Sequence, residues 1–225
     1  MSCPPYVAAI GVFLSALVAG QQPVPMSEDP HYKRLLYTAH LRMFEVAIPA
    51  GSSTPDHSHD HDVVTVALGE STLRTRKLGE EWSQPQSYRP GGTMIANYTG
   101  GVEAHRVENA GLALHRAIEV ENLRDRGWSM PQLITASATT LLEESRSFAV
   151  YDVRLNASTP QTTHVHRMPT MVVLIAGGVE VQGGGGESVF RMEMPGRWFP
   201  SQWDQPHTLT RVGTGDAHLV EVEAR

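Results

Sequence analysis

Histidines recur in this sequence at a spacing that suits metal binding. His57 and His59 are separated by a single residue, and so are His164 and His166. In an extended strand, residues i and i+2 point to the same face, so each pair can direct two imidazoles at one ion. Imidazole binds Fe, Mn, Zn, Ni and Cu. Each pair therefore predicts part of a transition-metal site.

Each pair is followed by a third histidine, His105 in the first half of the chain and His207 in the second. A Pro-Gly turn precedes each of them, and a closed sheet can bring this third imidazole opposite the pair. Three protein ligands that leave a coordination position open form the kind of site that supports catalysis. We therefore expect a three-histidine centre in each half. The alternatives are a polar surface loop around the first pair and a metal-free barrel in the second half.

Both centres belong to an internal repeat. Residues 44–48 and the first histidine pair recur 107 residues further on, as residues 151–155 and the second pair. Later the offset is 102, at which the third histidines match and Ala-Ile-Glu-Val-Glu (117–121) matches Leu-Val-Glu-Val-Glu (219–223). A duplication of this kind predicts two domains of the same fold.

The elements that position these residues are short. Within each copy, runs rich in Val, Leu, Ile and Thr are broken by Pro and Gly, which is typical of strands and turns. Between the copies the chain is polar, with a short helix expected around residues 139–145. This predicts an all-β protein of two barrels, residues 21–122 and 148–225, joined by a short, partly helical linker, residues 123–147. The expected strands are 41–48, 63–68, 71–76, 93–96 and 112–121 in the first copy, and 148–155, 171–182, 189–192 and 217–223 in the second.

The first copy resembles the cupin superfamily. The first motif of that family is Gly, five residues, His-x-His, three or four residues, Glu, six residues, Gly. Gly51 stands at the family distance from His57 and His59, and Asp62, seven residues before Gly69, takes the place of the family glutamate. One residue is missing between the histidine pair and this aspartate. The resemblance implies that Asp62 completes the ligand set of the first centre.

The second cupin motif is Pro-x-Gly, followed by His, three residues and Asn. Pro90-Gly91-Gly92 and the segment from His105 to Asn109 match it, with a longer gap before the histidine. In the second copy the histidine pair and Gly177 keep the spacing, but Thr170 stands where the family has its acid. Together the copies cover most of the chain from residue 41 onward. They are similar to bicupins, which have two tandem double-stranded β-helix, or jelly-roll, barrels.

The resemblance implies one divalent transition metal in the first barrel, Fe, Mn, Zn, Ni or Cu, and allows a second metal in the other barrel. His61 shares the strand face of the first histidine pair and is the alternative to Asp62, which strict alternation would turn away from the pair. The histidines of the second barrel have a metal-free alternative, as remnants of the duplication. The expected ligands are His57, His59, Asp62 and His105 in the first barrel and His164, His166 and His207 in the second.

The resemblance leaves two functional hypotheses. Cupins include dioxygenases, decarboxylases, isomerases, lyases, sugar-binding proteins and storage proteins, so the fold alone does not select a reaction. The first hypothesis is a metal-dependent enzyme, dioxygenase-like or of the lyase or isomerase type, acting on a small molecule in the first barrel. The second is a non-catalytic small-molecule-binding or scaffold cupin, which the absence of the family glutamate from both sites favours somewhat.

Charge and the N-terminal sequence bear on partners and location. The chain has 225 residues and a net charge of -6, without a dense Lys/Arg run, so we expect a small-molecule partner and no nucleic acid. The first twenty residues carry no charge, and the apolar run from Val7 to Val18 has the length of a signal-peptide core. We therefore expect residues 1–20 to be a signal peptide and the mature chain, without a membrane span, to be periplasmic or secreted. An uncovered barrel edge also permits a homodimer.

Overall fold

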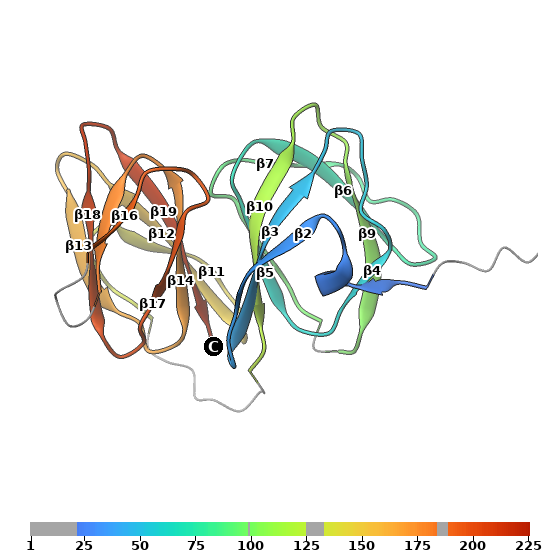
Figure 1. Ribbon diagram of the computed structural model, residues 1–225, viewed down its shortest axis with the longest axis horizontal. Coiled ribbons are helices and arrows are strands. Elements are labelled where there is room, and N and C mark those ends of the chain that lie inside the picture. Colours follow the sequence, from blue (N-terminus) through green and yellow to red (C-terminus); the bar gives the residue numbers. More distant parts are fainter. Residues whose placement is uncertain (1–21, 99, 125–132, 184–188) are drawn as a thin grey trace, which may run out of the picture.

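The computed structural model describes residues 22–98, 100–124, 133–183 and 189–225. Within these ranges the regular elements are β-strands and one 3-10 helix, η1 (Met26–Glu28). The strands form four sheets, which are arranged as two barrels side by side (Figure 1). The prediction of an all-β fold with two jelly-roll barrels is confirmed.

The first barrel consists of two five-stranded sheets, in the orders β1-β4-β9-β6-β7 and β2-β3-β10-β5-β8. Except for the parallel pair β1 and β4, neighbouring strands are antiparallel. The strands are β1 (Val24–Pro25), β2 (Tyr32–Tyr37), β3 (Leu41–Ile48), β4 (His57–His59), β5 (Val63–Ala67), β6 (Ser71–Lys77), β7 (Gln86–Tyr88), β8 (Thr93–Ala96), β9 (Glu103–Asn109) and β10 (His115–Asn122).

The second barrel repeats this plan with a five-stranded and a four-stranded sheet, in the orders β11-β12-β19-β14-β17 and β13-β18-β15-β16. Its strands are β11 (Thr139–Glu144), β12 (Phe148–Leu155), β13 (Gln161–Val165), β14 (Thr170–Ala176), β15 (Val179–Gln182), β16 (Val189–Met192), β17 (Trp198–Ser201), β18 (Pro206–Arg211) and β19 (Ala217–Ala224).

The short helix expected around residues 139–145 is wrong, because this segment is strand β11, paired antiparallel with β12. It is the counterpart of β2, which begins 107 residues earlier and has the same register shift against its neighbour. The Leu-Leu-Glu-Glu sequence favours a helix locally, but propensity is a weak prior that sheet pairing overrides. The segment expected to be a linker therefore contains the edge strand of a sheet.

Three hydrophobic clusters hold the barrels together. One fills each barrel, and the third lies between the barrels, where the sheets that contain β10 and β19 pack against each other (Figure 1). Strand β14 shows the principle: Val172 and Leu174 belong to the interior of the second barrel, whereas Met171 and Val173 belong to the cluster between the barrels. Since this sheet is buried on both faces, the strand is apolar at successive positions, and each fully buried aliphatic side chain contributes roughly 1.5–3 kcal/mol.

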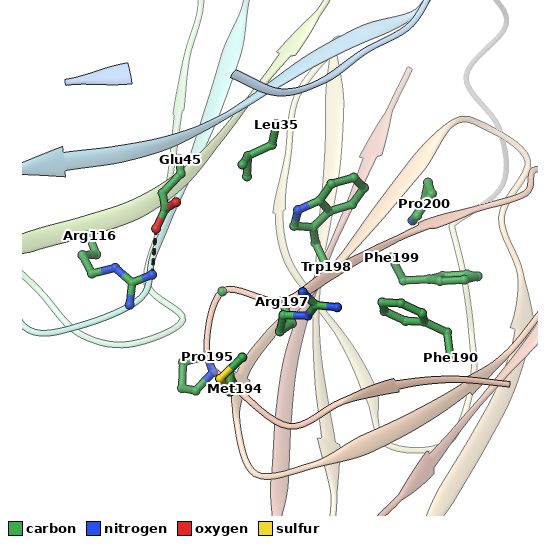
Figure 2. Close-up of a pocket in the computed structure, with 11 residues that line it drawn as sticks. Leu35, Glu45, Arg116, Phe190, Met194, Pro195, Arg197, Trp198, Phe199 and Pro200 are labelled. Carbon is green, nitrogen blue, oxygen red and sulfur yellow. Dashed lines mark hydrogen bonds and ion pairs between the residues drawn. The ribbon is translucent and has the colours of Figure 1, made fainter. Parts of the chain in front are cut away.

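A pocket of about 860 Å³ lies at the contact between the barrels (Figure 2). Leu35 and the ion-paired Glu45 and Arg116 line it on the side of the first barrel, and Phe190 and residues 194–200 line it on the other side. None of these lining residues is a predicted metal ligand.

The expected signal peptide, residues 1–20, lies outside the described residues, as do residues 125–132 of the expected linker. Among the described residues, no helix is long and apolar enough to cross a membrane.

Candidate metal centres

The first three predicted histidines converge inside the first barrel. His57 on β4 lies directly opposite His105 on β9, and alternation along β4 places His59 on the same face. The ring centroids lie 4.6 Å apart for His57 and His105, 5.1 Å for His57 and His59, and 4.9 Å for His59 and His105. Each ring offers a nitrogen within 4.8 Å of those of the others. We call these three residues the first cluster.

Burial keeps two imidazoles of the first cluster, those of His59 and His105, neutral. His57 is 0% and His59 2% exposed. Burial, together with the neighbouring imidazoles, lowers the pKa of His59 to about 2 and that of His105 to about 3. Neutral imidazole is the form that binds a metal, so the rings of His59 and His105 need not release a proton at neutral pH.

Several buried nitrogens of the first cluster have no hydrogen-bond partner in the described part of the chain. These are Nε2 of His57 and both ring nitrogens of His59. Buried polar atoms without a partner are rare in folded proteins, and each costs about 1–3 kcal/mol. A metal ion between the rings would satisfy one nitrogen of each. The residues of the first cluster therefore fit a metal.

Asp29 orients one of the rings. This residue follows η1 and is 2% exposed, and its Oδ2 lies 2.9 Å from Nδ1 of His57. Burial tends to raise the pKa of Asp29, but the contact with His57 and hydrogen bonds from His31 outweigh it, so the pKa is lowered and the side chain is a carboxylate. A carboxylate at Nδ1 favours a proton there and leaves Nε2 free for a metal, as in carboxylate–histidine–metal arrangements.

Two further polar side chains border the first cluster. The ring of Tyr98 stacks on His59 at a centroid distance of 4.6 Å and an interplanar angle of 8°, and its hydroxyl lies 3.3 Å from Nδ1 of His105. Oε1 of Glu119, on β10, lies 4.0 Å from Nδ1 of His59. Burial raises the pKa of Glu119 to about 8, with a smaller contribution from Glu121, so its carboxyl group is mainly neutral at pH 7.

The structure does not bring Asp62 to the first cluster. The chain bends after His59, and the buried Asp62 carboxylate accepts a 2.7 Å hydrogen bond from the backbone N–H of Tyr98 and another from the hydroxyl of Ser147. Asp62 thus joins the first barrel to the segment before β12. The alternative, His61, lies apart as well, with its Nδ1 2.6 Å from Oδ1 of Asp60.

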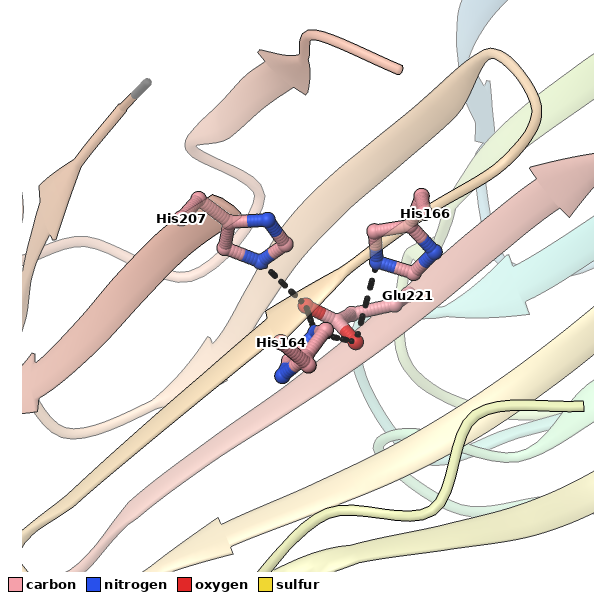
Figure 3. Close-up of side chains that lie close together, drawn as sticks. All are labelled: His164, His166, His207 and Glu221. Carbon is pink, nitrogen blue, oxygen red and sulfur yellow. Dashed lines mark hydrogen bonds and ion pairs between the residues drawn. The ribbon is translucent and has the colours of Figure 1, made fainter. Parts of the chain in front are cut away.

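The second set of histidines converges inside the second barrel. His164 on β13 lies opposite His207 on β18, and His166 follows two residues after His164. A carboxylate that the sequence analysis missed, Glu221 on β19, lies among them (Figure 3). Its oxygens are 2.9 Å from Nε2 of His164, 3.1 Å from Nε2 of His207 and 3.4 Å from Nε2 of His166. All four residues, which we call the second cluster, are buried.

Outer contacts fix the rings of the second cluster. Nδ1 of His207 lies 3.0 Å from the hydroxyl of Ser201, and Nδ1 of His166 lies 3.2 Å from Oε2 of Glu223. Burial lowers the pKa of His166, but Glu221 and Glu223 outweigh it and raise the pKa to about 9. The same contacts hold the pKa of Glu221 well below its ordinary value despite burial. Three Nε2 atoms and one carboxylate form a ligand set that suits a divalent metal.

The repeat contained a signal for Glu221. Residues 117–121 match residues 219–223, so Glu119 and Glu221 are counterparts. In both barrels this glutamate lies on the strand that contacts the histidines from the opposite sheet. The family spacing places its acid at position 170 instead, where the sequence has Thr170, whose hydroxyl donates a hydrogen bond to the carbonyl of Met168. Asp29, by contrast, lies outside the repeated motifs.

The comparisons with known proteins concern the fold. No protein-family model and no curated protein sequence matches the chain. Among solved structures it is similar to a cupin 2 conserved barrel domain protein from Leptotrichia buccalis, with a TM-score of 0.54, 9% identity, and 86% of this chain and 88% of that chain covered. It is also similar to a variant of salicylate 1,2-dioxygenase from Pseudoaminobacter salicylatoxidans in complex with gentisate, with a TM-score of 0.64, 12% identity, and coverage of 89% and 76%. An oxalate decarboxylase from Lactobacillus farciminis gives a TM-score of 0.60, 8% identity, and coverage of 83% and 77%. The chain therefore has a cupin fold, in a two-barrel arrangement like that of bicupins.

Proposed function

We propose that this protein is a metal-dependent bicupin enzyme whose reaction takes place at the first cluster. The observation that carries the proposal is the different position of the repeated glutamate. In the second cluster Glu221 contacts all three histidines, which gives the closed four-ligand set of a structural site. In the first cluster Glu119 stays 4.0 Å from the nearest ring, so three imidazoles would leave coordination positions for substrate or water.

When bound, a divalent transition metal would supply Lewis acidity and, in the case of Fe, Mn or Cu, redox chemistry. His57, His59 and His105 would hold it. Asp29 orients His57, and the hydroxyl of Tyr98 contacts Nδ1 of His105.

Glu119 is the candidate proton donor of this site. With no metal bound, burial raises its pKa to about 8, so its Oε1, which has no hydrogen-bond partner among the described residues, belongs to a mainly neutral carboxyl group at pH 7. A bound cation would lower this pKa. A group with a pKa near the working pH is suited to transfer a proton. The other oxygen accepts a 3.2 Å hydrogen bond from the hydroxyl of Thr65, which fixes the orientation of the carboxyl group.

The reaction class follows from analogy with the similar folds and is part of the proposal. The similar structures include a salicylate 1,2-dioxygenase in complex with gentisate and an oxalate decarboxylase. We propose a dioxygenase-like reaction on a small oxygen-bearing molecule, with a lyase or isomerase reaction as the alternative within the same site. We also propose that the chain is exported, which the uncharged apolar segment of residues 7–18 supports. An intact residue 1 in protein recovered from a secreted or periplasmic fraction would contradict cleavage.

The test is metal content per chain, followed by oxygen consumption with gentisate and related aromatic acids. We expect two metals in the unmodified protein. His59→Ala should lose one metal and all activity, whereas the matched variant His166→Ala should lose the other metal and keep the activity of the first cluster. Full metal content in His59→Ala would refute the site. Absence of metal from both clusters after reconstitution would support the non-catalytic, small-molecule-binding alternative instead.

A further inference from the structure

The contact between the barrels is built from repeated elements. Gly91 and Gly196, from the two Pro-Gly turns, each reach across to the other barrel with a positive φ, +78° and +86°. A Cβ on Gly91 would lie 2.2 Å from Cε1 of His218, and a Cβ on Gly196 would lie 2.8 Å from Cδ1 of Leu68. Each turn therefore packs closely against the opposite barrel.

A pair of ionisable side chains stands beside each turn. Arg116 pairs with Glu45 at 2.8 Å, and His218 pairs with Asp152 at 2.6 Å. These are repeat counterparts, at the same offsets of 102 and 107 residues that relate the two motifs. The interface therefore contains the same arrangement of a Pro-Gly turn and an ion pair twice. Residues that differ between the two arrangements can be identified by comparing them.

The 860 Å³ pocket lies beside one of these two places, and its lining departs from the repeat. In the first barrel Thr93 of β8 pairs with Val66 of β5. In the second barrel Trp198 of β17 pairs with Val173 of β14, the repeat counterpart of Val66. Arg197 and Phe199 flank this tryptophan, where the first barrel has a glycine and a methionine. The second barrel therefore carries two aromatic rings and a guanidinium group at this side of the interface, and the matching positions of the first barrel do not.

The aromatic residues form an apolar wall. Phe190 and Phe199 lie 5.7 Å apart, tilted by 34°, and both are only partly buried, as is Trp198 (Figure 2). Met194, at the rim, is 63% exposed. A volume of this size lies within the range of about 300–1,000 Å³ that is usual for small-molecule sites, which are mostly apolar with a few polar groups.

The charge of the pocket is positive. Glu45 and Arg116 neutralise each other, but the exposed Arg197 has no carboxylate oxygen within ion-pair distance in the described parts of the chain. Its guanidinium carbon lies 5.6 Å from the ring centroid of Phe190. A cation placed against an aromatic wall complements a ligand that joins an aromatic body to an anionic group.

We propose that this inter-barrel pocket binds a small aromatic carboxylate, with its ring against Trp198, Phe190 and Phe199 and its carboxylate on Arg197. The site is separate from both clusters, since no lining residue belongs to either, and it does not depend on the proposed enzymatic activity.

The test uses two fluorescent probes that share an aromatic body, the anionic anilinonaphthalene sulfonate and the uncharged N-phenylnaphthylamine, on the metal-loaded protein. We expect one high-affinity site for the anionic probe, displaced by naphthoate. Arg197→Gln should raise the Kd of the anionic probe about 10-fold or more, because a charge-assisted contact is lost, and should leave the Kd of the neutral probe unchanged. Phe190→Leu should weaken the binding of both probes.

The control is Arg191→Gln, which removes an exposed arginine that lies outside the pocket and contacts Glu180 and Glu193. Equal affinity of the anionic probe for Arg197→Gln and the unmodified protein would overturn the proposal, as would an equal loss in Arg191→Gln. Circular dichroism and metal content of each variant establish that it is folded. Failure of naphthoate to displace the probe would also overturn the proposal.

Discussion

The two repeated glutamates lie in similar places but in opposite states of ionisation, so the same substitution should change stability in opposite directions. Glu221 is ionised and contacts three imidazoles, one of which, His166, carries a proton with a pKa of about 9. Glu119 is buried without such a cation, and its pKa is raised to about 8. In the metal-free protein at pH 7, Glu221→Gln should therefore destabilise the fold and Glu119→Gln should stabilise it.

The magnitudes follow from the surroundings of each side chain. Glu221→Gln removes one of the two carboxylates beside the His166 imidazolium and leaves Glu223 at 3.2 Å, so the loss should be at most the roughly 3–5 kcal/mol that breaking a buried ion pair costs. For Glu119, the ordinary pKa of 4.5 means that the unfolded chain is ionised at pH 7, whereas the folded chain has to take up a proton. This uptake costs about 3 kcal/mol, which Glu119→Gln should recover. The gain should disappear as the pH falls below 4.5, because the carboxyl group is then protonated in both states.

Urea unfolding of the chelator-treated proteins at pH 7 and pH 4 measures both effects. For a chain of this size, 1 kcal/mol corresponds to a shift of about 2–4 °C in Tm, so thermal unfolding gives an independent value. The reasoning is refuted if both variants shift the free energy of unfolding in the same direction at pH 7. It is also refuted if the stabilisation by Glu119→Gln is as large at pH 4 as at pH 7.

Three further predictions concern positioning, pH and close packing. Asp29→Asn should lower the metal affinity of the first cluster about 10–100-fold and leave that of the second cluster unchanged. An equal loss of metal affinity at both clusters, measured by competition with a chelator, would contradict this. Burial lowers the pKa of His115 to about 4, so the free energy of unfolding should fall as the pH drops from 6.5 towards 4, by about 2 kcal/mol at pH 5. Urea midpoints that fall by the same amount in His115→Gln and in the unmodified protein would contradict this. Gly91→Ala should destabilise the fold by about 1–3 kcal/mol more than Gly79→Ala, because only the Cβ added at position 91 collides with a side chain, that of His218. Equal Tm values of the two variants would contradict this.

The sequence was sufficient to predict what depends on strand alternation and on the repeat. His57 and His59 face the same way because they are two residues apart, and the repeat identified the corresponding pair and both third histidines. The acid was predicted from a family spacing, at Asp62, but a bend after the first pair turns this side chain towards Ser147. A bend of this kind depends on contacts with a distant segment, which spacing does not show.

Contacts between separate elements account for the other differences. Asp29 lies far from His57 in the sequence and reaches it only because β1 pairs with β4, and β1 has two residues and no recognisable pattern. A short helix was predicted around residues 139–145 from the local composition, yet pairing with β12 makes residues 139–144 a strand. In each case a long-range contact outweighed the local preference.

The duplication explains how one scaffold can hold two centres with different chemistry. Both barrels place three imidazoles at the same strand positions and a glutamate on the opposing sheet. In the first barrel Tyr98 stacks on His59 and Thr65 holds one carboxyl oxygen of Glu119, so the acid stays back from the rings and remains mainly neutral. In the second barrel Glu221 reaches all three rings and is ionised. The position of one carboxyl group therefore distinguishes the two clusters, and under the proposed function it would leave open positions at a metal in the first and close the ligand set in the second, while the strands that carry the histidines remain the same.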